Sequence, residues 1–129
     1  EPDDRVPHDP ADYPVEKWQR VASPVWMDID PQDTLQYRSA REHDDERHIC
    51  PLQLEVIRRG IDLWTNPGDI VLSPFAGIGS EGYVALQMRR RFVGIELKAS
   101  YYQQAARNLK AALQGTGDLF YQDAAEEPA

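Results

Sequence analysis

Hydrophobic positions follow a helical spacing between residues 51 and 64, where they recur every three or four residues. The apolar residues of this stretch are Leu52, Leu54, Val56, Ile57, Ile61, Leu63 and Trp64. Pro51 is well placed near the first turn of such a helix, since its missing N–H costs nothing there. The turn sequence Asn66-Pro67-Gly68-Asp69 predicts where the helix stops.

The pattern changes at residue 70 and then repeats. Ile70-Val71-Leu72 is a short continuous apolar run, which predicts a buried strand of a parallel sheet. A second helix is expected from Gly79 to Arg90, closed by three arginines at the negative end of its dipole. A second strand is expected over residues 92–95. Ser100 is expected to cap a third helix, and residues 118–121 to begin a third strand.

This order of elements predicts an α/β fold, in which a partial parallel sheet is flanked by helices. Ligands of such sheets bind beyond the carboxyl ends of the strands. The loop at residues 73–82 and the residue Glu96 both follow strands, so both are expected at that edge.

Three segments differ in composition. Residues 1–47 are rich in Asp and Pro and are expected to form a flexible acidic leading segment and a loop region. Residues 48–123 are expected to form the α/β part, and residues 124–129 a frayed tail. The three tryptophans, Trp18, Trp26 and Trp64, are expected in the core.

Charge and cysteine content narrow the class of protein. The chain has 129 residues and a net charge of −8, so it has no electrostatic reason to bind nucleic-acid phosphates by itself. A single cysteine excludes an internal disulfide and fits a reducing, cytoplasmic location. No apolar stretch is long enough to predict a membrane span. The first residue is Glu1 rather than Met, which suggests a trimmed or partial protein.

The loop after the first strand contains the spacing G-x-G-x-x-G, in Gly77-Ile-Gly79-Ser-Glu-Gly82. The first two glycines would let the backbone approach a ligand, and the N–H groups of the next helix could face a carboxylate or a phosphate. Glu96 follows Gly77 by about twenty residues, where an acid can accept both ribose hydroxyls. A tight strand-to-helix turn with a surface glutamate is the simpler interpretation.

Two cofactor classes share this geometry. A nicotinamide dinucleotide enzyme needs a sheet of about six strands, for which the chain is too short. Such an enzyme also gives no reason for Pro74 and Phe75.

Four landmarks together resemble one family. The loop Ser73-Pro-Phe-Ala-Gly-Ile-Gly-Ser80 resembles the Asp-Pro-Phe-x-Gly-x-Gly-[Ser/Thr] loop of S-adenosylmethionine-dependent DNA amino-methyltransferases. Gly94-Ile-Glu96 matches their second strand end, and His48-Ile-Cys-Pro51 is similar to their His-x-x-Pro segment. Asn66-Pro-Gly-Asp69 also fits. The resemblance implies a Rossmann-like class I methyltransferase fold, a permuted motif order and the phage and prophage branch.

The resemblance also implies a cofactor site. Phe75, Gly77 and Gly79 would shape the methionine end of the S-adenosyl-L-methionine pocket, Ser80 would face the cofactor carboxylate, and Glu96 would hold the ribose. The full set of implied binding residues is His48, Cys50, Pro51, Ser73, Pro74, Phe75, Gly77, Gly79, Ser80 and Glu96. Two positions depart from the family: Ser73 replaces its Asp, and Glu81 replaces its second hydroxyl residue.

One family element is missing from the chain. These enzymes flip a base out of double-stranded DNA and bind it beside an [Asp/Asn/Ser]-Pro-Pro-aromatic motif. The chain has no Pro-Pro, and Ser23-Pro-Val-Trp26 is a poor imitation, so no catalytic residue is assigned. We expect a C-terminal, cofactor-binding part of an enzyme that methylates an exocyclic amine of adenine or cytosine, as in restriction-modification systems, with DNA bound by a preceding part.

Other interpretations stay open at this point. A non-catalytic cofactor-binding module, or a split subunit that needs a second chain, would carry the same loop. A nicotinamide-binding fragment is a weaker alternative. In each case an incomplete sheet would expose apolar surface, which favours a homo-oligomer or a partner chain. No metal site and no membrane partner are expected.

Overall fold

The computed structural model describes residues 8–35 and 50–115. The elements in chain order are α1 (Val15–Val21), α2 (Leu54–Trp64), β1 (Ile70–Ser73), α3 (Ser80–Gln87), β2 (Arg91–Gly94) and α4 (Ala99–Gly115). From α2 onward this is the predicted order of helices and strands. His48 and the strand expected at residues 118–121 lie outside the described residues.

The two strands form a parallel sheet joined by α3. Ile70 pairs with Arg91 and Ser73 with Gly94, so both strands end at the same edge. Val71 and Phe92 pack with α2 and α3 around the buried residues of the core, which are Ile57, Ile61, Val84 and Ala85. The β1–α3–β2 crossover is the α/β unit that the alternation of patterns predicted.

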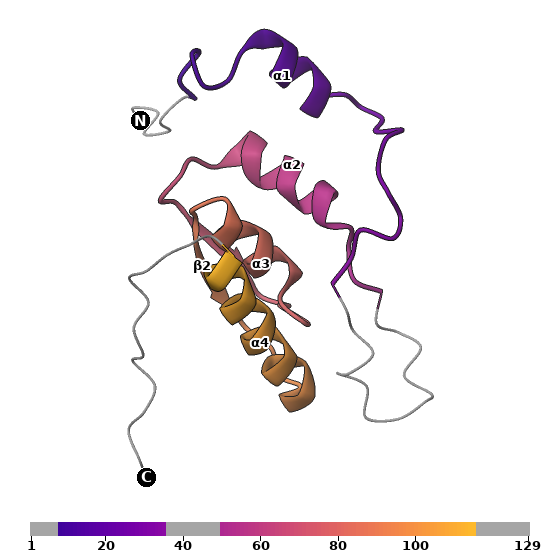
Figure 1. Ribbon diagram of the computed structural model, residues 1–129, viewed down its shortest axis with the longest axis vertical. Coiled ribbons are helices and arrows are strands. Elements are labelled where there is room, and N and C mark those ends of the chain that lie inside the picture. Colours follow the sequence, from indigo (N-terminus) through magenta and orange to yellow (C-terminus); the bar gives the residue numbers. More distant parts are fainter. Residues whose placement is uncertain (1–7, 36–49, 116–129) are drawn as a thin grey trace.

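The helices stack in chain order, with α2 between α1 and α3 and α4 against the other side of α3 (Figure 1). Gly82 allows α4 and β2 to approach α3 closely. A Cβ at Gly82 would lie 2.5 Å from the side chains of Leu109 on α4 and Phe92 on β2. The third glycine of the loop motif therefore serves helix and strand packing.

The helix α1 was not predicted, because residues 1–47 were expected to form a flexible segment and loops. Its apolar residues Val15, Trp18 and Val21 recur every three positions, a signal too short to stand out. Two ion pairs hold this part of the chain to α2. Lys17 lies 3.0 Å from Asp62, and the buried Arg59 (3% exposed) makes a bidentate contact with Asp28 at 2.8 and 3.0 Å. Residues 8–35 are thus fixed by side chains of α2.

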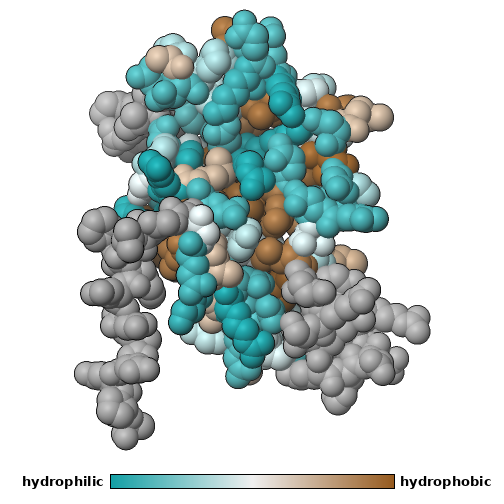
Figure 2. Space-filling model, in the orientation of Figure 1, coloured by the Kyte–Doolittle hydropathy of each residue, from teal (hydrophilic) through white to brown (hydrophobic). Residues whose placement is uncertain are grey.

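One face of the sheet is exposed, so the expectation of a buried first strand was wrong for half of its residues. Ile70 and Leu72 on β1 lie on the face opposite α3, and Leu72 is 63% exposed. Val93 and Ile95 lie on the same face and are about half exposed. The described helices lie on the α3 side of the sheet, where Val71 and Phe92 pack, and the other face is left exposed. The helical surface seen in Figure 2 is by contrast mostly hydrophilic.

The predicted end of the helix after the glycine loop was displaced by local geometry. The helix α3 ends at Gln87 rather than Arg90, because Arg89 adopts a left-handed φ of 62° and Arg91 already pairs in β2. Arg90 is buried, and its guanidinium donates to the carbonyl oxygens of Met88 and Thr65. Arg90 therefore connects the end of α3 to the residue after α2, in addition to placing a cation at the end of α3.

Three further expectations were wrong. Pro51 precedes the N-cap of α2, Gln53, and so lies outside the first turn. Ser100 is the second residue of α4 rather than its cap. Trp64 is 82% exposed, and Trp18 is also exposed, so neither is a core residue. Within residues 8–35 and 50–115, none of the helices combines the length and the apolar character needed to cross a bilayer.

Candidate functional site

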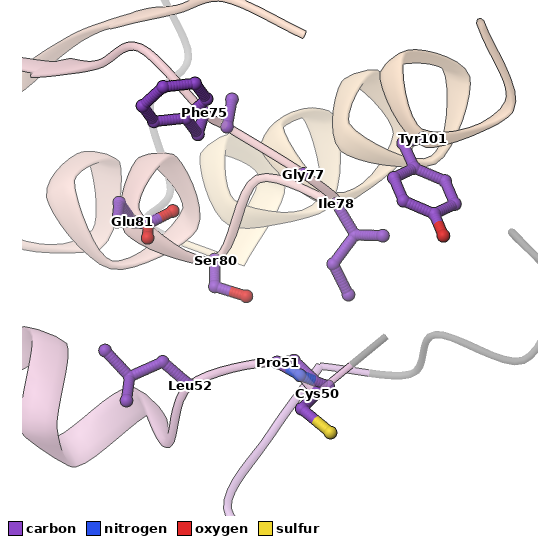
Figure 3. A pocket seen from close by; sticks show the side chains of 10 residues that line it. Cys50, Pro51, Leu52, Phe75, Gly77, Ile78, Ser80, Glu81 and Tyr101 are labelled. Carbon is purple, nitrogen blue, oxygen red and sulfur yellow. The ribbon is translucent and has the colours of Figure 1, made fainter. Parts of the chain in front are cut away.

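A pocket of about 250 Å³ lies at the loop that follows β1. The segment at residues 50–52 forms one wall, and residues 75–81 of the loop and the start of α3 form the other (Figure 3). Tyr101, from the start of α4, closes one side. Its lining residues are Cys50, Pro51, Leu52, Phe75, Ala76, Gly77, Ile78, Ser80, Glu81 and Tyr101. The volume lies just below the range of about 300–1,000 Å³ that is usual for ligand pockets, so it suits one end of a nucleoside cofactor.

The loop takes its shape from two glycines with positive φ. Gly77 has a φ of 54° and Gly79 a φ of 82°, values that side chains other than glycine adopt at a cost. Gly79 is the N-cap of α3 and has no side chain with which to satisfy the first N–H groups of the helix. Tyr83 is the first residue to donate back, to Gly79 O at 2.8 Å. The N–H groups before it have no partner within the helix and can face an anionic ligand group.

Neighbouring elements hold this loop in place. The Ala76 N–H donates to Ile95 O at 2.9 Å, just beyond the end of β2. Asn108 on α4 donates to Ile78 O at 2.8 Å. The Glu96 carboxylate accepts from the Gly77 N–H and the Lys98 N–H, each at 2.8 Å. These hydrogen bonds fix the conformation of the pocket wall.

The two loop glycines meet different surroundings. A Cβ at Gly77 would have no atom within 4 Å, whereas a Cβ at Gly79 would lie 3.1 Å from Ala105 Cβ and 3.2 Å from Ala105 Cα. Gly79 faces α4 and does not line the pocket. Its conformational freedom and its small size serve the approach of α4, rather than the ligand contact that the sequence suggested.

The structure brings together five of the ten predicted binding residues. Those lining the pocket are Cys50, Pro51, Phe75, Gly77 and Ser80. Four others are near in sequence or bonded to the loop but do not line the pocket: Ser73, which is buried, Pro74, Gly79 and Glu96. His48 lies outside the described residues.

Five lining residues were not predicted. They are Leu52, Ala76, Ile78, Glu81 and Tyr101. Leu52 and Tyr101 fit helical apolar stripes, and such a spacing favours a packing role. The apolar positions inside the glycine loop were an available signal, because a loop between a strand and a helix has little reason to be apolar unless it faces a cavity.

The pocket has an acidic character. Its walls are apolar apart from the side chains of Cys50, Ser80, Glu81 and Tyr101, and no arginine or lysine is among the residues that line it. In the part of the chain that the structure describes, no group of three or more His, Cys, Asp or Glu side chains is arranged to hold a metal ion. The pocket therefore combines apolar walls with a thiol, two hydroxyls and a carboxylate, beside the N–H groups at the start of α3.

A parallel β–α–β unit with a glycine loop closing a pocket at the strand ends defines a Rossmann-like nucleotide-binding protein. The chain belongs to the DNA methylase family of the N6/N4 type, whose model matches residues 3–107. The fold is therefore of the class I methyltransferase kind.

Named relatives agree with this family. The DNA adenine methyltransferase YhdJ of Escherichia coli K12 is 40% identical over 67 residues, which is 52% of this chain and 23% of the relative. The type II methyltransferase M.BglII of Bacillus subtilis is 37% identical over 73 residues, or 55% of this chain and 20% of the relative. The chain thus spans about a quarter or less of the length of these two proteins.

A solved structure supports the fold. TTHA0409 of Thermus thermophilus, crystallised with S-adenosyl-L-methionine, is 28% identical with a TM-score of 0.58, over 79% of this chain and 34% of that one. A second crystal structure of the same protein gives a TM-score of 0.60. The predicted α/β, Rossmann-like fold is confirmed at this level.

Proposed function

We propose that the pocket binds the amino-acid end of S-adenosyl-L-methionine, and that the chain is the cofactor-binding part of an enzyme that methylates an exocyclic amine of adenine or cytosine in DNA. One observation carries the proposal. In a chain of the DNA methylase family, the loop at residues 73–80 closes a pocket at the carboxyl ends of two parallel strands.

The pocket residues suit the parts of this cofactor. Its carboxylate would lie at the free N–H groups of α3 with the Ser80 hydroxyl, where the helix dipole favours an anion. Its apolar chain would lie between Phe75 and Pro51, with Cys50 on the same wall as Pro51. When bound, the cofactor supplies an electrophilic methyl group on a sulfonium sulfur.

Glu96 would hold the ribose. One hydrogen bond from the Gly77 N–H of the loop and one from the Lys98 N–H occupy one site on each carboxylate oxygen. A carboxylate has about four acceptor sites, so about two remain for ribose hydroxyls. In this role Glu96 would couple the ribose to the position of the loop.

Residues that polarise the target amine would come from outside this chain. The methyl acceptor nitrogen needs hydrogen-bond acceptors beside it and a stacked aromatic ring, which the Pro-Pro-aromatic motif supplies in the family the sequence resembles. We propose that such a motif precedes this part in the permuted order, as in phage-type enzymes, and that the preceding part binds double-stranded DNA. Incubation of this chain with radiolabelled cofactor and DNA of mixed sequence is expected to leave the DNA unlabelled. Labelling above a no-protein control would contradict this.

The bare face of the sheet favours association. Ile70, Leu72, Val93 and Ile95 form one apolar surface on a two-stranded sheet with open edges. We propose that another part of the enzyme, a second copy or a partner chain covers it. A clean monomer in sedimentation at high concentration, without binding of an apolar dye, would count against this.

Calorimetric titration of the intact protein with S-adenosylhomocysteine and with NAD tests the cofactor assignment. S-adenosylhomocysteine is expected to bind and NAD is not, because the Glu81 carboxylate among the lining residues would repel a pyrophosphate. Glu96→Gln is expected to weaken binding roughly tenfold or more, since charge-assisted hydrogen bonds contribute about 1.5–3 kcal/mol each. Glu16→Gln, in the first turn of α1, is the matched control. Preference for NAD, or indifference to Glu96→Gln, would overturn the assignment.

A further inference from the structure

Glu81 is the one charged residue among those that line the pocket. It is the second residue of α3, it is partly buried, and it follows Ser80, whose side chain points into the space between the two walls (Figure 3). Among the described residues, its carboxylate has no hydrogen bond or ion pair. The carboxylate can therefore bind a cationic group of a ligand in the pocket without giving up a partner in the described part of the chain.

The position of Glu81 conflicts with a ligand that carries only negative charge. The N–H groups at the start of α3 attract an anion, while the Glu81 carboxylate beside them repels one. Both preferences are met by a ligand that has an anionic and a cationic group on one carbon atom. The amino-acid end of the proposed cofactor is such a zwitterion.

We propose that the Glu81 carboxylate binds the α-ammonium group of the cofactor while the N–H groups of α3 and Ser80 bind its carboxylate. Glu81 is then a specificity-determining residue, which selects a zwitterionic amino-acid end and rejects the phosphates of dinucleotides. This inference rests on the proposed function, because it assigns one group of the same ligand to one side chain of the same pocket.

A simpler role for Glu81 makes a different prediction. A glutamate in the first turn stabilises a helix through the dipole, whatever the pocket contains. In that case Glu81→Gln would lower the stability of the protein and would change the affinity for every ligand alike. A role in binding the ammonium would instead make the effect depend on which ligand carries an amino group.

Three ligands separate these roles by calorimetry with the intact protein. They are S-adenosylhomocysteine, its analogue without the α-carboxylate, and its analogue without the α-amino group. Glu81→Gln is expected to weaken the first two roughly tenfold or more, since each loses a charge-assisted hydrogen bond. The same substitution is expected to leave the third unchanged or to tighten it, because a repulsion is removed. Glu16→Gln, which removes a first-turn glutamate from α1 instead, is expected to change none of the three affinities.

Each other result would overturn the proposal in a recognisable way. Equal weakening of all three ligands would show a purely structural role for Glu81. Tighter binding of S-adenosylhomocysteine to Glu81→Gln would show that the side chain faces the cofactor carboxylate. Failure of wild-type protein to bind S-adenosylhomocysteine would contradict the proposed function itself, and the assignment of Glu81 with it.

Discussion

The two glycines at the turn of the loop are expected to differ sharply when each is replaced by alanine. Both have positive φ, so each substitution places an L residue in the left-handed region, at a cost of about 1–2 kcal/mol. Only Gly79 meets a neighbour: its new Cβ would lie 3.1 Å from Ala105 Cβ and 3.2 Å from the backbone Cα of α4. The backbone of α4 cannot rotate away as a side chain can.

Overpacking of this kind costs about 1–3 kcal/mol. Gly79→Ala is therefore expected to lower the free energy of unfolding by roughly 2–5 kcal/mol, and Gly77→Ala by roughly 1–2 kcal/mol. Urea denaturation followed by circular dichroism, without ligand, measures both values. Gly77→Ala, since Gly77 lines the pocket, is expected to be the variant with the more selective loss of cofactor affinity.

A second substitution checks the cause. Ala105→Gly removes the nearest atom, so in that background Gly79→Ala is expected to cost less than it does in the wild type. Equal losses for Gly79→Ala and Gly77→Ala would refute the packing explanation. So would a Gly79→Ala cost that is independent of residue 105.

Two sets of side-chain contacts that involve buried arginines give further testable predictions. Arg90→Lys is expected to cost about 1.5–3 kcal/mol in urea denaturation, because an ammonium cannot keep all the contacts that the buried guanidinium fork makes with Thr65 and Met88; an unchanged midpoint would contradict this. Asp28→Asn is expected to lower the melting temperature at neutral pH, because the hydrogen bond from Arg59 lowers the pKa of Asp28 from its usual 3.8 to about 2. A carboxyl with a lowered folded-state pKa stabilises the fold above about pH 4, and that contribution is lost as the pH falls toward 2. The difference in melting temperature between wild type and Asp28→Asn should therefore shrink over that window; a constant difference would assign the effect to packing.

The loop shows how residues close in sequence come to have different tasks. Gly77 and Ser80 line the pocket, Gly79 makes room for α4, and Gly82 makes room for Leu109 and Phe92. A glycine motif therefore combines ligand contact with helix packing, and only part of it reports on the ligand. Substitutions at Gly79 and Gly82 are tests of folding, whereas those at Gly77 and Glu81 are tests of binding.

The order of elements and the place of the site could be predicted from the sequence alone. Apolar spacing is local information, because a helix with one buried face and a buried strand each need their own period. The run at residues 51–64 therefore predicted α2, with a start about three residues too early, and the run at residues 70–72 predicted β1 to within one residue. The carboxyl ends of parallel strands share one edge, so the sequence alone placed the loop after β1 at the ligand site.

Which side chains meet across that edge depends on the packing of the whole chain. Tyr101 and Leu52 have the apolar spacing of packing residues, yet the turn of α4 and the segment before α2 bring them to the pocket. The left-handed turn at Arg89 and the bidentate contact of Arg59 with Asp28 depend on neighbours distant in sequence, so no local pattern predicts them. The bare face of the sheet is likewise a property of which elements are packed together. Periodicity indicates that a helix or strand has one apolar face. The elements packed against that face decide which residues it contacts.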